Sequence, residues 1–196
     1  MKYDVLIAGV GGQGTVLASR MIALAAIDAG LFTRTSETIG MAQRGGSVVS
    51  HVRVDSSASS PIIPMSTSDV IIAFELAEAA RSLPRLKKGG KCIINTQIIK
   101  PVTASLGNSA YDSDEIIGFI KKNVPKAVFI DGYSLAEKAG SVKAVNIVLL
   151  GAACAAGMLP FSKESLEKAI KENVPEKYLN LNIKALNSGY DSVNNL

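Results

Sequence analysis

The sequence predicts a single α/β domain over residues 1–196. Short apolar runs with the length of buried strands alternate with segments of helical periodicity, which is the pattern of consecutive βαβ units. The first run, Val5–Ala8, is apolar on both faces, as a parallel strand covered by helices on both sides requires. Hydrophobic residues make up 47% of the chain and aromatic residues only 5%, so aliphatic side chains must build the core. We therefore expect a three-layer Rossmann-like domain with a mostly parallel sheet and helices on both faces.

The first part of the chain supplies three strands and one helix. A strand at 3–8 leads into a helix at about 13–29, which ends at Gly30 as its C-cap. Strands are expected at 31–36 and at 47–54, and the alternating side chains of the second of these predict that it is half-exposed. The packed stripe of the helix is expected to consist of apolar residues at helical spacing, namely Val16, Leu17, Met21, Leu24 and Ala25.

The rest of the chain repeats the βαβ pattern after a proline-bracketed connector. Pro61 and Pro64 exclude the segment between them from a central helix or strand. Strands and helices then alternate, and the right-handed crossover of such units makes their sheet parallel. In chain order the expected elements are a strand at 70–74, a helix, a strand at 91–95, a helix at 116–122, a strand at 127–130, and helices at 134–139 and 163–172.

Residues 145–161 form a segment without a charged residue. The segment is too short and too rich in small residues to span a bilayer, so no membrane association is expected. Alanines cover every side of the helix that it would form, which leaves no polar face for water. Two interpretations remain open: a core helix that lies on the sheet, or a helix that is buried against another subunit.

Two glycine-rich turns lie close together in the sequence. Gly9-Val10-Gly11-Gly12-Gln13-Gly14 stands between the first strand and the first helix, where backbone N–H groups can approach an anion at the helix N-terminus. Gln43-Arg44-Gly45-Gly46 follows about thirty residues later and adds a fixed positive charge. One such turn is a weak signal, but the pair together predicts a ligand.

Polar residues follow the expected strands at their carboxyl ends, which is where open parallel sheets bind ligands. Glu37, Glu75, Asn95 and Asp131 each come just past a strand. Taken singly, Glu75 also fits a helix N-terminal charge, and Asp131 fits a turn residue before a glycine. Taken together with the glycine turns, they predict one site at this edge of the sheet. The residues expected to contact a cofactor are Gly9, Gly11, Gly12, Gln13, Gly14, Gln43, Gly45, Gly46, Glu75 and Asn95.

Composition argues against several classes of function. The net charge of +4 comes from 21 basic and 17 acidic residues spread along the chain, which disfavours nucleic-acid binding. Cys92 and Cys154 lie in apolar runs and fit buried free thiols. Without a C-x-x-C motif and with one histidine, the chain cannot by itself hold a four-iron cluster or a Cys/His zinc site, so no metal site is expected. The first apolar run does not fit a signal peptide, and a cytoplasmic protein is therefore expected.

An independent NAD(P)-binding enzyme is one alternative for the glycine turns. Such domains place an acidic residue about twenty positions past the last glycine to hold the ribose, and Arg34 stands there instead. Arg34 would suit a 2′-phosphate, but Glu37 lies only a few positions further on. His51, the single histidine, lies in an alternating strand and fits a structural role better than that of a general base. A base for hydride-transfer chemistry is therefore missing.

The combined motifs resemble the γ-type catalytic domain of 2-oxoacid:ferredoxin oxidoreductases. The Ala42-Gln43 form of the second turn and the following Ser50-His51-Val52-Arg53 favour the β subunit of the indolepyruvate branch over the pyruvate and 2-oxoglutarate branches. The resemblance covers most of the chain. It is carried by both glycine turns, Ser36-Glu37, the run from Gly40 to Ser47, Ser60-Pro61-Ile62-Ile63-Pro64, Asn95-Thr96, Asp131-Gly132, Ala139-Gly140 and residues 146–151.

The resemblance implies a subunit of an enzyme that oxidatively decarboxylates an aryl pyruvate. CoA would accept the acyl group, carbon dioxide would leave, and ferredoxin would take two electrons. Thiamine diphosphate and iron–sulfur clusters would sit on a larger partner subunit, so that this chain alone binds no cofactor and completes the active site in a heteromer. Its glycine turns would face the thiamine diphosphate, the CoA or the partner.

Arg44 and Glu37 are the expected catalytic residues. Arg44 would hold or steer a carboxylate or phosphate, while Gly45 and Gly46 keep the backbone close. Glu37 would orient Arg44 or transfer protons near the thiamine. Two alternatives stay open: Arg44 and Glu37 could only pair to fix a loop at the subunit interface, or the chain could be an assembly subunit that contacts no ligand.

Overall fold

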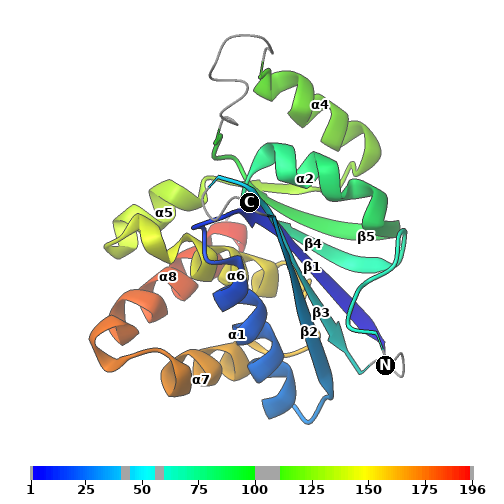
Figure 1. Ribbon diagram of the computed structural model, residues 1–196. Helices are drawn as coiled ribbons and strands as arrows, with labels where there is room; N and C mark the ends of the chain where they lie inside the picture. Colours follow the sequence, from blue (N-terminus) through cyan, green and yellow to red (C-terminus); the bar gives the residue numbers. More distant parts are fainter. Residues whose placement is uncertain (1, 41–44, 56–59, 100–110, 195–196) are drawn as a thin grey trace.

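A computed structural model describes residues 2–40, 45–55, 60–99 and 111–194. Six strands form one sheet in the order β2-β3-β1-β4-β5-β6 (Figure 1). β1, β4, β5 and β6 run parallel, whereas β3 runs antiparallel between β1 and β2. The mostly parallel α/β sheet that the sequence predicts is confirmed. The strands are β1 (Tyr3–Val10), β2 (Thr33–Ile39), β3 (Ser47–Val54), β4 (Ser68–Ala73), β5 (Leu86–Asn95) and β6 (Val128–Ile130).

Every strand except β3 ends at the same edge of the sheet. Because β2 and β1 are both antiparallel to β3, they point in one direction, and β4, β5 and β6 share it. We call this side the carboxyl edge and the opposite side, where β1 begins, the amino edge. β3 begins at the carboxyl edge, where Val10 of β1 lies opposite Ser47.

Helices cover both faces of the sheet, and each face has its own hydrophobic core (Figure 1). Successive residues of β1 alternate between the two cores: Ile7 packs into the larger one and Leu6 into the smaller one. The helices over the larger core are α1 (Thr15–Asp28), α5 (Gly132–Ala139), α6 (Val145–Ala155), α7 (Lys163–Asn173) and α8 (Glu176–Asn194). Those over the smaller core are α2 (Leu76–Ser82) and α4 (Ser113–Asn123), and short 3-10 helices lie at η1 (Leu83–Arg85) and η2 (Val142–Ala144).

The uncharged helix α6 is buried within this chain, mainly by α8. Two glycines let the helix backbones meet. A Cβ on Gly151 would lie 2.1 Å from the carbonyl oxygen of Leu186, and a Cβ on Gly189 would lie 1.9 Å from that of Val148. The core-helix interpretation of this segment is confirmed. The helix α8 is not among the elements predicted from the sequence, although its buried residues Ala185, Leu186 and Gly189 lie at helical spacing.

Three local expectations are wrong. Pairing with β3 extends β2 to Ile39, so Glu37 lies inside the strand rather than past its end. β3 is almost entirely buried rather than half-exposed, because strands flank it on both sides and the sheet is covered on both faces. Val16 and Leu17, expected on the packed stripe of α1, are 46% and 38% exposed because they lie in its first turn at the carboxyl edge.

Candidate functional site

The two glycine turns meet at the carboxyl edge. The N–H of Gly11 donates to the carbonyl of Gly46 at 2.8 Å, and the N–H of Gly45 donates back to the carbonyl of Gly11 at 3.4 Å. Gly12 and Gly45 have φ values of 101° and 73°, in the left-handed region that favours glycine. The predicted pairing of the turns is therefore present in the fold. Gln43 and Arg44 lie outside the described residues.

The first turn of α1 presents backbone donors at this edge. Gly14 occupies the N-cap position in the left-handed conformation, and among the described residues no side chain caps the helix there. The first N–H groups of a helix have no partner within the helix and carry the positive end of its dipole. An uncapped helix N-terminus behind a glycine turn has the donors that bind a phosphate or carboxylate.

Two amide side chains form the floor of the site. The Nε2 of Gln13 and the Nδ2 of Asn95 both donate to the carbonyl of Phe74 at 3.0 Å. The oxygen of Gln13 accepts from the N–H of Val10 at 2.9 Å, and that of Asn95 accepts from the N–H of Gly132 at 2.9 Å. Both side chains are buried and bonded at both ends within the protein. They fix the loops after β1, β4 and β5 relative to one another.

Glu75 is buried and lies at the N-cap of α2. Its carboxylate accepts from the N–H of Glu78 at 3.0 Å, from the N–H of Ile99 at 3.4 Å and from the hydroxyl of Tyr111. Burial first, and then the hydrogen bond to this carboxylate, raises the pKa of Tyr111. Asp131 likewise caps α5 by accepting from the N–H of Ser134 at 3.0 Å. Both carboxylates therefore cap the N-terminus of a helix, which is the structural role that the sequence also allowed for each of them.

Glu37 lies two residues before the end of β2, opposite Ser50 of β3. Its side chain accepts a hydrogen bond from the hydroxyl of Ser19 on α1 at 3.2 Å, and the residue is exposed. This places Glu37 on the same side of the sheet as α1 and within reach of solvent.

Sequence reasoning missed a polar group beside the second glycine turn. The buried carboxylate of Glu78 accepts from the hydroxyl of Ser47 at 2.6 Å and forms an ion pair with Arg81. Ser47 is the residue directly after Gly46, so Glu78 ties α2 to the exit of that turn. The spacing of Glu78, three residues before Arg81 and three after the N-cap Glu75, was the available signal.

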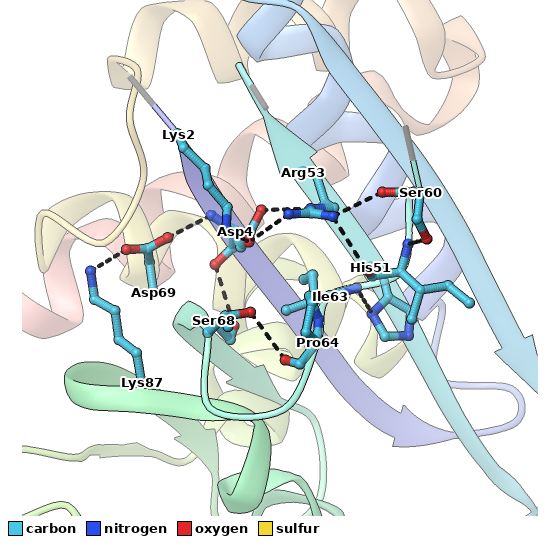
Figure 2. Close-up of polar contacts among 12 residues, drawn as sticks. Lys2, Asp4, His51, Arg53, Ser60, Ile63, Pro64, Ser68, Asp69 and Lys87 are labelled. Atoms are coloured by element: carbon cyan, nitrogen blue, oxygen red, sulfur yellow. Dashed lines mark hydrogen bonds and ion pairs between the residues drawn. The ribbon is translucent and has the colours of Figure 1, made fainter. Parts of the chain in front are cut away.

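His51 lies in the middle of β3, opposite Leu6 of β1, and has a structural environment (Figure 2). It is buried, and its Nδ1 accepts from the N–H of Ile63 at 3.2 Å. Burial, followed by the charges of Arg85 and Arg53, lowers the pKa of His51 to about 4. The imidazole is therefore neutral near pH 7 and holds the proline-bracketed segment, in agreement with the expected structural role.

The cysteines and the helices add two further findings. Burial raises the pKa of Cys92 to about 12, and burial also raises that of Cys154, which is half-buried. Both thiols are therefore protonated near neutral pH. Within the described part of the chain, no cluster of three or more His, Cys, Asp or Glu side chains could hold a metal ion, and no helix is long and apolar enough to cross a membrane.

The chain matches known proteins over almost its whole length. Residues 4–192 match the family model described as pyruvate ferredoxin/flavodoxin oxidoreductase. The chain is 44% identical to indolepyruvate oxidoreductase subunit IorB of Archaeoglobus fulgidus over 97% of this chain and 95% of that protein.

Solved structures share the fold. The γ subunit of a keto/oxoacid ferredoxin oxidoreductase from Geobacter sulfurreducens superposes with a TM-score of 0.72, at 26% identity and 99% coverage of both chains. A 2-oxoglutarate:ferredoxin oxidoreductase from Magnetococcus marinus superposes with a TM-score of 0.73 at 24% identity, over 100% of this chain but only 31% of that one. The match over nearly the whole length, with the paired glycine turns in place, shows that the chain belongs to the pyruvate ferredoxin/flavodoxin oxidoreductase family.

Proposed function

We propose that this chain is the smaller subunit of an indolepyruvate-type 2-oxoacid:ferredoxin oxidoreductase. The complex converts an aryl pyruvate and CoA into an aryl-acetyl-CoA and carbon dioxide, and passes two electrons to ferredoxin. The relatives named indolepyruvate oxidoreductase subunit, which are 35–44% identical over almost their whole length, support this substrate class. Thiamine diphosphate and iron–sulfur clusters belong to the larger partner subunit, in keeping with two cysteines here that are far apart in sequence and protonated.

The observation that carries the proposal is the joined pair of glycine turns beside an uncapped helix N-terminus. The bonds between Gly11 and the 45–46 turn bring the segment that follows Arg44 against the first turn. Backbone N–H groups that lack side-chain obstruction suit the phosphate groups that CoA and thiamine diphosphate both carry. When bound by the complex, thiamine diphosphate supplies the carbanion stabilisation that decarboxylation needs.

In the proposed reaction, the residues of this chain bind an anionic group and hold the loops around it in place. The N–H groups around Gly12 and the α1 N-terminus hold an anionic group, and Arg44 adds a charged donor for a carboxylate or phosphate. Gln13, Asn95 and Glu75 keep this edge rigid through the bonds described above, and the Glu78–Ser47 bond fixes the second turn. Glu37 orients Arg44 or moves a proton at the carboxylate oxygen that faces solvent. The protein works in the cytoplasm.

The test is reconstitution of the chain with its larger subunit and measurement of CoA-dependent ferredoxin reduction. We expect turnover with indolepyruvate and phenylpyruvate to exceed turnover with pyruvate and 2-oxoglutarate. Preference for either aliphatic oxoacid would overturn the substrate class. An equilibrium titration of the chain alone with NADPH tests the alternative of an independent NAD(P)-binding enzyme. We expect no binding, and saturable binding would favour that alternative.

A purely assembling role is distinguished by two single substitutions. Arg44→Ala and Glu37→Gln should each leave association with the larger subunit unchanged and lower turnover. If both variants lower association and leave the turnover of the complex that does form unchanged, the chain acts only in assembly.

A further inference from the structure

The first turn of α1 exposes apolar side chains beside the glycine turns. Val16 is 46% and Leu17 38% exposed, directly after the uncapped N-terminus. Val142 of η2 is 43% and Tyr178 of α8 is 48% exposed, and Tyr178 lines the same pocket as Leu17. Single exposed apolar residues are ordinary, but a group of them at a site's rim marks an interaction surface.

Leu17 and Tyr178 line one groove, which we call the α1–α8 groove. It has a volume of about 600 Å³ and combines apolar side chains with small polar ones. Among the described residues that line it, Lys143 is the one charged residue and none is a carboxylate. The lining comprises Leu17, Ser141, Lys143, Ala144, Asn146, Asn173, Val174, Pro175, Tyr178, Leu181 and Asn182.

The groove is continuous with the carboxyl edge. Asn146, which lines it, donates from Nδ2 to the carbonyl of Gly14 at 3.4 Å. A Cβ on Gly14 would lie 2.8 Å from that Nδ2, so the glycine turn and the groove wall are in direct contact. Whatever occupies the groove therefore lies against the glycine turn that the proposed function places at the active site.

Val16 and Val142 are also exposed although they do not line the groove, so exposed apolar side chains are not confined to it, which suits a protein segment better than a small molecule. The same fold occupies only 31% of the length of the Magnetococcus chain, so in that protein a much larger polypeptide is joined to it. The described lining, with Lys143 and without a carboxylate, suits a segment that carries an acidic residue among apolar ones.

We propose that the larger catalytic subunit inserts an apolar segment with an acidic residue into the α1–α8 groove, pairs that residue with Lys143, and so covers the glycine turns. This inference rests on the proposed function only in requiring a larger partner. It explains why the first turn of α1 departs from the packed pattern that its sequence periodicity suggests.

The experiment measures the dissociation constant between the purified larger subunit and variants of this chain. Leu17→Asp should weaken association by about 30-fold or more, as for a central interface residue. A negative charge in the first turn of a helix interacts favourably with the positive end of the helix dipole, so the variant is expected to fold. Ile27→Asp is the matched control: Ile27 lies on the same helix, is 56% exposed, and should bind as the unmodified chain does.

A charge reversal tests the partner's chemistry. Lys143→Glu should weaken association, whereas Lys184→Glu, an exposed lysine of α8 outside the groove, should have little effect. Unchanged association for both Leu17→Asp and Lys143→Glu would overturn the inference, as would binding of free phenylpyruvate to this chain that Leu17→Asp abolishes while association persists. A native complex that forms but oxidises no 2-oxoacid would contradict the proposed function and leave the interface result intact.

Discussion

The two edges of the sheet both carry polar residues, but they use them differently. At the amino edge, the guanidinium of Arg53 pairs with Asp4 at 3.0 Å, with both side chains almost fully buried, and also donates to the carbonyls of Ser60 and Ile62 (Figure 2). At the carboxyl edge, buried amides hold the loops, while the uncapped start of α1 leaves backbone N–H groups for other acceptors. We call the amino edge closed, because these charged groups are paired within the protein, and the carboxyl edge open, because backbone donors remain there for a ligand.

This difference separates structural from functional polarity. A buried charge or a buried histidine is not evidence of chemistry when its partners all lie within the fold, as for Arg53 and His51. In the described part of the chain, the N-terminus of α1 has no side-chain cap, and its first backbone N–H groups have no partner within the helix, which is what a ligand-binding edge requires.

The largest effect is expected from a substitution that breaks the Asp4–Arg53 ion pair at the closed edge. Asp4→Asn leaves the buried Arg53 without its counter-charge and should lower the free energy of unfolding by about 3–5 kcal/mol. Denaturant unfolding of the isolated chain measures this. Lys87→Met, which removes an exposed partner of Asp69, is the control and should cost less than about 1 kcal/mol. Equal losses for the two variants would show that the Asp4–Arg53 pair is no more important than a surface pair.

An intermediate effect is expected inside the open edge. A Cβ on Gly9 would lie 2.9 Å from both the Oε1 of Gln13 and the Cγ2 of Thr15, so Gly9→Ala should destabilise the chain by about 1–3 kcal/mol. Gly12→Ala meets no atom within 4 Å and carries only the strain of its positive φ, about 1 kcal/mol. Thermal unfolding compares the two, and a larger loss for Gly12→Ala would contradict the assignment of Gln13 to a rigid floor.

A smaller and pH-dependent effect belongs to His51. The folded protein holds its pKa near 4, below the unfolded value of 6.5, so the unfolded state takes up the proton first as the pH falls. The contribution of neutral His51 to the free energy of unfolding is complete above about pH 6.5. It is lost as the pH falls from 6.5 to 4, with a slope of at most about 1.4 kcal/mol per pH unit. His51→Asn keeps an acceptor for Ile63 and should flatten this part of the stability profile. An unchanged profile would mean that His51 does not cause it.

The sequence predicted the features that depend on local pattern. Short apolar runs located most strands, and glycine spacing identified two turns that the fold joins. It did not predict contacts that depend on distant segments. Gln13, in the loop after β1, and Asn95, at the end of β5, both donate to the carbonyl of Phe74, and their role follows only from that shared contact.

Burial by segments that come later in the chain could not be predicted from local sequence patterns either. The apolar helix α6 is covered by α8, whose glycine-mediated contact joins residues far apart in the chain. The extension of β2 depends on pairing with β3, which moved Glu37 from a loop into a strand. The exposed positions of Val16 and Leu17 depend on where the first turn of α1 meets the edge of the sheet.

The most direct test of the open edge combines folding and turnover in one variant. Arg44→Ala should leave the free energy of unfolding within about 0.5 kcal/mol and the association with the larger subunit unchanged. It should lower the CoA-dependent turnover of aryl pyruvate by the reconstituted complex by about 100-fold, as the loss of a charged donor at a reacting centre does. Normal turnover with unchanged KM for the 2-oxoacid and CoA would contradict the account.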